Sequence, residues 1–307
     1  MKIEGIHHIT AITGQAQRNV DFYADLLGLR LVKKTVNQDQ PNVYHLFYAD
    51  EEGSAGADLT FFEFRDAAPG RAGAGMVHRI VWRLGTPDAL DFWERRLADA
   101  GTEVNRHDGG VRFADFEGLE HELVVADTPD APLTAEHPEI PAEFALQGFD
   151  AAHAYSADPQ RSADLLAEGL GFSGSGSAWE ARGDHRGGRW IYDEPPAQPG
   201  IQGAGTVHHI AWASEMDDHE AWRQRVMQHG ARPTPVIDRF WFRSVYFREP
   251  SGVLFEIATL GPGFAIDEDP DALGEKLILP PFLEEHREEI ERHLTPITNP
   301  RERAKAG

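Results

Sequence analysis

The hydrophobic and polar positions of this chain alternate in four separate runs, and each run predicts a short strand. The runs are residues 5–13, 76–84, 149–157 and 207–215. After each run, apolar residues recur near the spacing of an amphipathic helix. The predicted helices are AQRNVDFYADLLGLRL, PDALDFWERRLADAGTEV, PQRSADLLAEGLGF and DDHEAWRQRVMQHGARP. The chain therefore repeats a unit that begins with a strand and a helix.

Each unit continues through extended segments in which aromatic and β-branched residues accompany Gly, a composition typical of strands joined by turns. The last of these segments are residues 57–65, 118–126, 187–193 and 253–260. The helices of the first and third units share the sequence ADLL, and those of the second and fourth share an aromatic start, so the units alternate in type. We predict an α+β fold built from four βαβββ modules in two tandem domains.

A Pro-rich, acidic segment between the second and third modules has the composition of a linker. We place the N-terminal domain, with modules 1 and 2, at 1–128 and the linker at 129–147. The C-terminal domain, with modules 3 and 4, is placed at 148–262, and residues 263–307 form a predicted helical tail. The length of 307 residues agrees with two domains, since one domain averages ~150 residues.

The composition removes several classes of function. The chain has no Cys, which excludes disulfides, thiolate metal sites and a cysteine nucleophile. Acidic residues outnumber basic ones 51 to 29, and a net charge of -22 repels nucleic acids and anionic membranes. No stretch approaches the ~20 apolar residues of a membrane span, and the start carries no apolar leader. We expect a cytoplasmic protein without nucleic-acid or membrane partners, for which a homo-oligomer is compatible with the sequence.

Without Cys, a metal ion would have to bind His and carboxylate side chains. Alignment of the first strands of the four units places four residues at equivalent positions: His8, Arg79, His153 and His209. Alignment of the last strands groups three carboxylates: Glu63, Glu122 and Glu256. A single His on a strand is more often structural than a ligand, and we interpret His78, His107 and His121 in that way.

Repetition of the triplet His-His-Ile at 7–9 and 208–210 distinguishes two of the histidines. We predict that His209 and Glu256 bind a metal ion. The third ligand is His8 if the fourth unit pairs with the first, or His153 if it pairs with the third; the matching triplet favours His8. Two imidazoles and one carboxylate leave adjacent positions open on an octahedral metal, which suits iron(II).

The βαβββ repeat, with HHI on a first strand and FEI on a last strand, resembles the vicinal oxygen chelate superfamily. This superfamily includes glyoxalase I, fosfomycin and bleomycin resistance proteins and type I extradiol dioxygenases. The segments REPSGVLFEIATLGPGFAIDED and LGEKLILPPFLEEHREEIERHL resemble the ring-cleaving dioxygenases of para-hydroquinones. The resemblance implies a dioxygenase that acts on a small aromatic substrate and dioxygen, with iron(II), or manganese(II), on His8, His209 and Glu256.

The same resemblance implies further site residues. In the hydroquinone enzymes, an Arg and a Tyr at spacings that match Arg239 and Tyr246 line the substrate pocket. In these enzymes, residues at the positions of His7, Thr10 and His208 also line the pocket. A guanidinium and a phenol are chemically suited to hydrogen-bond a phenolate and developing negative charge on oxygen. Since side chains alternate across a strand, we expect His7 to point to the opposite face from His8 and Thr10.

Two other functions compete with the dioxygenase. A glyoxalase-like lyase or isomerase with nickel or zinc would call for a fourth protein ligand, which Glu63 could supply. A non-enzymatic resistance or binding protein would not need the metal. Under the favoured pairing, the second and third units form another cavity without a metal, because Arg79 replaces the required His and leaves His153 and Glu122 as structural residues.

Overall fold

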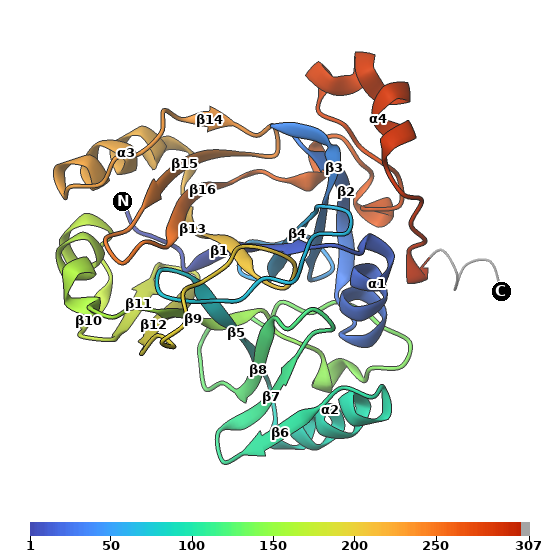
Figure 1. Ribbon diagram of the computed structural model, residues 1–307, viewed down its shortest axis with the longest axis horizontal. Coiled ribbons are helices and arrows are strands. Elements are labelled where there is room, and N and C mark those ends of the chain that lie inside the picture. Colours follow the sequence, from blue (N-terminus) through green and yellow to red (C-terminus); the bar gives the residue numbers. More distant parts are fainter. Residues whose placement is uncertain (302–307) are drawn as a thin grey trace.

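The computed structural model describes residues 1–301, which form two eight-stranded sheets (Figure 1). The first sheet has the order β14-β15-β16-β13-β1-β4-β3-β2. Its strands are β1 (Ile6–Thr13), β2 (Arg30–Asn37), β3 (Gln40–Ala49), β4 (Asp58–Glu63), β13 (Val207–Ser214), β14 (Ile237–Asp238), β15 (Phe242–Arg248) and β16 (Leu254–Pro262). This sheet therefore combines the strands of the first unit with those of the fourth.

The second sheet has the order β10-β11-β12-β9-β5-β8-β7-β6. Its strands are β5 (Val77–Leu84), β6 (Val104–His107), β7 (Gly110–Ala114), β8 (Glu120–Val125), β9 (Phe149–Tyr155), β10 (Ser173–Ser175), β11 (Ala178–Arg182) and β12 (Gly187–Asp193). It combines the second unit with the third. The predicted α+β fold of four modules is thus present, and the fourth unit pairs with the first and not with the third.

Each sheet is joined at its centre by the first strands of two units. β1 pairs with β13 and β5 pairs with β9, and both pairs are antiparallel. Within each unit, the first strand also lies parallel to the last strand. Each sheet takes one unit from each half of the chain, so the proposed boundaries of the domains and of the linker at 129–147 stay a prediction.

The two regular helices follow the predicted amphipathic pattern. α2 (Pro87–Asp99) starts after Thr86, whose side-chain oxygen accepts a hydrogen bond from the backbone N–H of Ala89. α3 (His219–Gln228) buries Trp222 and Val226. Both lie at the periphery of the molecule in Figure 1, while the sheets occupy its centre.

The helices that contain the ADLL sequence are less regular than predicted. α1 (Ala16–Val20) is only five residues long and continues as a π-helix over Asp21–Leu26. The third unit has a 3₁₀ turn over Pro159–Ser162 followed by a π-helix over Leu165–Gly169. In both π-helices a backbone N–H reaches the carbonyl five residues earlier, from Leu27 to Phe22 and from Leu170 to Leu165.

The tail consists of short helical pieces that return to the first sheet. It contains 3₁₀ turns and α4 (Arg287–His293), which lies beside β3 in Figure 1. Lys33 of β2 is fully buried and donates hydrogen bonds to the carbonyl of Phe264 and to Asp267. The last part of the predicted tail, 302–307, lies outside the described residues.

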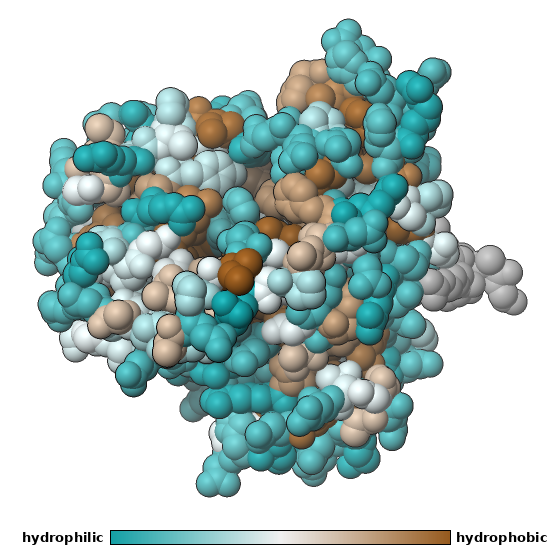
Figure 2. All heavy atoms as spheres, viewed as in Figure 1, coloured by the Kyte–Doolittle hydropathy of each residue, from teal (hydrophilic) through white to brown (hydrophobic). Residues whose placement is uncertain are grey.

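Large aromatic side chains fill the interior, and six Trp residues are among the largest fully buried side chains: Trp82, Trp93, Trp190, Trp212, Trp222 and Trp241. Hydrophilic residues cover most of the face seen in Figure 2, with hydrophobic residues in small patches between them. Among residues 1–301, no helix has the length and apolar character that crossing a bilayer requires.

Candidate metal centre

Two histidines and one glutamate meet at the centre of the first sheet. Nε2 of His8, on β1, lies 3.2 Å from Nε2 of His209, on β13. One carboxylate oxygen of Glu256, on β16, lies 3.2 Å from Nε2 of His8 and 3.0 Å from Nε2 of His209. All three side chains are buried, with Glu256 fully so. The structure therefore brings the three predicted ligands together, and His153 lies in the other sheet.

Strand register explains how residues so distant in sequence converge. In the antiparallel β1–β13 pair, Thr10 is opposite His209 and His8 is opposite Ala211. In the parallel β13–β16 pair, Ala211 is opposite Glu256. His8 and Glu256 thus flank the strand that carries His209, one on each side.

A β-bulge at each His-His-Ile triplet changes the direction of the side chains. The β1–β13 ladder skips His7 between the pairs of Ile6 and His8, and it skips His208 between His209 and Val207. A bulge breaks the two-residue alternation of a strand. The expectation that His7 points to the opposite face from His8 is wrong, because their Nδ1 atoms are 2.9 Å apart. The Nδ1 atoms of His208 and His209 are likewise close, at 2.8 Å.

The hydrogen bonds of His7 determine the tautomer of His8. The carbonyl of Thr259 can only accept, so Nε2 of His7, at 3.1 Å from it, carries a proton. Burial and the neighbouring His8 lower the pKa of His7 to about 3, so the ring is neutral and its Nδ1 accepts from Nδ1–H of His8. Nε2 of His8 then presents a lone pair to His209 and Glu256.

The donor set fits a divalent cation. Glu256 is fully buried, and its carboxylate faces the Nε2 atoms of both histidines. Neither of its oxygens has a hydrogen-bond donor within the described residues. Imidazole nitrogen and carboxylate oxygen atoms at this separation repel one another unless a proton or a metal ion lies among them, and this combination of ligands is typical of non-haem iron and related metals.

A cavity with aromatic walls opens beside the three residues. His8 and His209 form part of its lining, and its other walls include Phe47, Phe62, Trp241, Phe242 and Tyr246. Apolar walls with a few polar groups are typical of small-molecule sites. The wall beside the ligand atoms is therefore largely aromatic.

Arg239 and Tyr246, both predicted site residues, line this cavity. The guanidinium carbon of Arg239 lies 5.5 Å from the centre of the Tyr246 ring, which packs edge-on against His209. Burial and Glu256 raise the pKa of Tyr246, so its hydroxyl stays protonated and is able to donate a hydrogen bond. Arg239 also forms a two-point ion pair with Asp39 at 2.9 and 3.2 Å.

His7, Thr10 and His208 are not among the residues that line the cavity. His7 and His208 instead contact the neighbouring ligands His8 and His209 through their Nδ1 atoms. The hydroxyl of Thr10 is 2.7 Å from that of Thr60 on β4, which is 2.9 Å from Nε2 of His45 on β3. Catalytic roles for His7, Thr10 and His208 stay a prediction.

His45 is a cavity residue that the sequence analysis missed. Its ring packs against Phe47 and Phe62, with ring centres 3.9 and 4.4 Å away. Burial, with His8 and His209 nearby, lowers the pKa of His45 well below its usual value, so the ring is neutral. It lies on a middle strand of the unit, whereas the repeat comparison considered first and last strands only. The one available signal was a His within the aromatic run VYHLFY.

The alignment of Glu63 with Glu256 is wrong by three residues. Glu256 is opposite Ala211, two residues after His209. The corresponding position in the first unit, two residues after His8, is Thr10, and its partner is Thr60. Glu63 is opposite Thr13 and accepts a hydrogen bond from the backbone N–H of Ala16. A threonine therefore occupies the place where a fourth protein ligand was considered.

In the second sheet, an arginine lies where the first sheet gathers its ligand atoms. Arg79 is 3.0 Å from Glu122 through Nε, and its Nη2 is 2.9 Å from Nδ1 of His153 and 3.3 Å from Asp193. His78 also reaches Asp193, at 2.8 Å. Because a guanidinium already supplies positive charge among these acceptors, a second cation is electrostatically disfavoured here.

The remaining histidines of this sheet have structural contacts. His107 is 3.1 Å from Glu122. His121 is fully buried, accepts a hydrogen bond from the indole of Trp82 at 3.1 Å and lies 3.0 Å from the hydroxyl of Tyr23.

Comparison with known proteins identifies relatives along almost the entire chain. MhqO of Bacillus subtilis, named for a proposed ring-cleaving dioxygenase activity, is 42% identical over 96% of this chain and 97% of its own. Chlorohydroquinone/hydroquinone 1,2-dioxygenase of Sphingobium indicum is 32% identical over 94% of this chain and 95% of its own. Both relatives therefore match in length as well as in sequence.

Solved structures agree with these sequence matches. The crystal structure of a proposed dioxygenase from Bacillus subtilis has a TM-score of 0.89 with 40% identity, and covers 97% of this chain and 98% of that one. A glyoxalase I variant from Zea mays shares the fold, with a TM-score of 0.59 at 14% identity over 83% of this chain and 92% of that one. The family model of the glyoxalase/bleomycin resistance protein/dioxygenase superfamily matches residues 5–130 and 148–257. The chain belongs to this superfamily.

Proposed function

We propose that the protein is an iron(II)-dependent dioxygenase that cleaves the ring of a hydroquinone-type or related dihydroxy aromatic, with His8, His209 and Glu256 as metal ligands. The observation that carries the proposal is the convergence of two imidazoles and one carboxylate beside an aromatic-walled cavity, with Thr60 in the place of a fourth ligand. The relatives named for ring-cleaving and hydroquinone dioxygenase activities support the same chemistry.

The residues of this chain bind and orient the reactants. When bound, iron(II) would supply the redox chemistry between the aromatic ring and dioxygen, and manganese(II) accepts the same ligands. Phe62, Trp241 and Phe242 line the cavity and would pack against the flat ring. The protonated hydroxyl of Tyr246 and the guanidinium of Arg239 donate hydrogen bonds to oxygen atoms on which negative charge develops.

A glyoxalase-like reaction is less well supported. That chemistry was expected to use a second carboxylate ligand, and the candidate for it, Glu63, accepts a hydrogen bond from the backbone of Ala16. Thr60, at the corresponding register, is engaged with Thr10 and His45.

The test is reconstitution of the metal-free protein with iron(II) under anaerobic conditions, followed by measurement of oxygen uptake with a panel of hydroquinones and catechols. We expect uptake, with loss of the aromatic absorbance, for at least one hydroquinone. Glu256→Gln, which removes a ligand charge at constant shape, serves as the inactive control. Absence of uptake with every compound would reject the dioxygenase. Turnover of a hemithioacetal by the nickel or zinc form would favour the lyase or isomerase.

A further inference from the structure

A buried carboxylate without a hydrogen-bond partner lies next to the proposed metal centre. Asp58, at the start of β4, is 1% exposed. Among residues 1–301, only Asp58 and Glu256 have both carboxylate oxygens buried without any hydrogen-bond partner. Burial of an unpartnered carboxylate is costly, so such groups call for an explanation. For Glu256 the explanation is the proposed metal; no described residue donates a hydrogen bond to Asp58.

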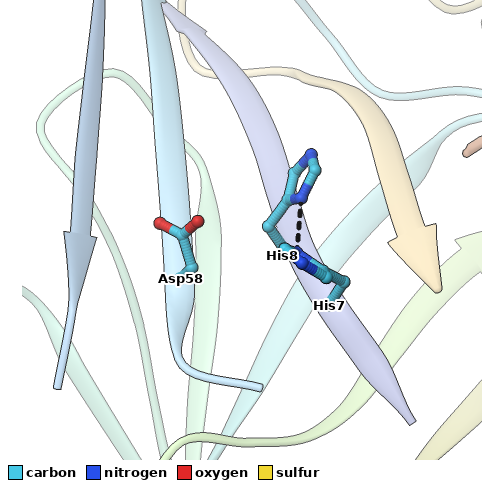
Figure 3. A group of neighbouring side chains, drawn as sticks. All are labelled: His7, His8 and Asp58. Carbon is cyan, nitrogen blue, oxygen red and sulfur yellow. Dashed lines mark hydrogen bonds between the residues drawn. The ribbon is translucent and has the colours of Figure 1, made fainter. Parts of the chain in front are cut away.

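The position of Asp58 associates it with His7 and His8. In the parallel β1–β4 pair, Asp58 is opposite His8. A carboxylate oxygen of Asp58 and one ring nitrogen each of His7 and His8 all lie within 4.8 Å of one another. Figure 3 shows the carboxylate on the strand beside the two rings, which are joined by their hydrogen bond. In the sheet, β4 lies on the other side of β1 from β13 and β16, the strands that carry His209 and Glu256.

Burial, together with the acidic groups Asp50 and Glu256, raises the pKa of Asp58 well above its usual value, so the charged carboxylate is destabilised in the metal-free protein. A divalent metal on His8 would reverse this, because coordination withdraws electrons from the ring and makes its Nδ1–H more acidic and more positive.

The second unit has a more exposed carboxylate at the same register. Glu120 is opposite Arg79, the residue that corresponds to His8, so Glu120 occupies the register of Asp58. Its carboxylate is 3.5 Å from Nδ1 of His78, the residue that the β5–β9 ladder skips as the β1–β13 ladder skips His7. A carboxylate next to the bulged histidine therefore recurs in both units.

We propose that Asp58 is the outer-sphere carboxylate of the metal centre and positions His8 through the His7–His8 pair. It stabilises the proton that His8 shares with His7, which keeps Nε2 of His8 free for the metal. The inference rests on the proposed metal centre, and it assigns Asp58 a positioning role and no contact with the substrate.

The test uses manganese(II) as the probe, because its binding can be followed by electron paramagnetic resonance in air and without turnover. We compare wild type, Asp58→Asn and the control Asp115→Asn. Asp115 is also buried, but it accepts hydrogen bonds from Tyr23 and from the backbone of Glu117 and Leu119. Melting of the metal-free proteins is measured in parallel.

Asp58→Asn should weaken manganese binding by about 10- to 100-fold, and should leave the melting temperature of the metal-free protein unchanged or raise it. Asp115→Asn should do the reverse, with lower melting and unchanged affinity. The inference is overturned if Asp58→Asn binds manganese within about twofold of wild type. It is equally overturned if the metal-free variant melts lower or does not fold, which indicates a structural role. Wild type that binds neither manganese(II) nor iron(II) would instead refute the proposed metal centre itself.

Discussion

Nε2 of His8 and Nε2 of His209 lie 3.2 Å apart, although 201 residues separate them in the chain. Their proximity follows from the antiparallel pairing of β1 with β13, in which the first and fourth units share one sheet. The corresponding position of the third unit, His153, faces Arg79 in the other sheet. The choice of His8 over His153 therefore depends on which units pair.

We expect replacement of His8 and replacement of His153 to have opposite effects on metal content. His8→Ala removes one of three proposed ligands, so we expect the purified protein to lose most of its iron or manganese. His153→Ala removes a group that already contacts Arg79 and Asp193, and the metal content should be retained. Elemental analysis after purification measures both. A full metal complement in His8→Ala, together with loss in His153→Ala, would contradict the proposed site.

Replacement of Glu63 tests the number of protein ligands. Glu63→Gln keeps the side-chain shape and an acceptor for the N–H of Ala16. We expect metal affinity and oxygen uptake within about twofold of wild type, whereas Glu256→Gln should lose about tenfold or more in affinity. Isothermal titration with manganese(II) provides the affinities. A loss in Glu63→Gln that equals the loss in Glu256→Gln would support the four-ligand, glyoxalase-like alternative.

His45 provides a test of the cavity that is separate from the metal. His45→Phe keeps an aromatic ring between Phe47 and Phe62 and removes both ring nitrogens. Thr60 retains Thr10 as a partner, so we expect little change in stability and in metal content. If the imidazole contacts the substrate, kcat/KM should fall by about tenfold or more, in the range of a lost hydrogen bond to a bound polar group. Unchanged kinetics would exclude that contact.

His121 should make the protein sensitive to acid. Burial lowers the pKa of His121 to about 3, well below the ~6.5 of an unfolded chain. As pH falls below ~6.5, the unfolded state binds a proton that the folded state refuses, so stability that is complete above this pH decreases toward pH 3. Urea unfolding of the metal-free protein between pH 8 and 4 measures the decrease. In His121→Gln, stability at pH 7 should be lower, because the hydrogen bonds to Trp82 and Tyr23 are altered. The decrease of stability with acid should be shallower than in wild type. An equally steep decrease would show that other groups cause it.

Lys33 connects the tail to the wall of the cavity. Its ammonium pairs with Asp267 and Glu268 and lies 5.1 Å from the ring of Trp241, whose indole N–H donates to Asp267. Lys33→Met would leave the two carboxylates without this cation, which costs about 3–5 kcal/mol when a buried pair is broken. We expect a lower melting temperature and a higher KM, because Trp241 lines the cavity.

The neighbouring Lys34 is the matched control for this variant. Its ammonium donates to the carbonyl oxygen of Glu275 in the same tail. Lys34→Met should therefore have a clearly smaller effect on melting and should leave KM unchanged. Equal effects of the two substitutions would argue against a specific role of Lys33 in holding the wall.

Much of the architecture could be predicted from the sequence, because it depends on local patterns. Alternating and helical periodicities revealed four modules, and the repeated His-His-Ile triplet distinguished His8 and His209 from the other histidines. The sequence predicted one α-helix over residues 16–31, but α1 has only five residues and continues as a π-helix. That widening depends on packing, and Tyr23 within it reaches Asp115 and His121 of another unit.

The sequence by itself determined the repeat and the types of residue that could bind a metal, because strand periodicity and repeated motifs are properties of short segments. Only the tertiary structure decided which units share a sheet, and so whether His8 or His153 joins His209. It also decided the register that puts Thr60 in the place considered for Glu63 and the bulges that turn His7 toward His8. A shift of a few residues in a ladder exchanges one neighbour for another, and such shifts result from contacts between strands far apart in the chain.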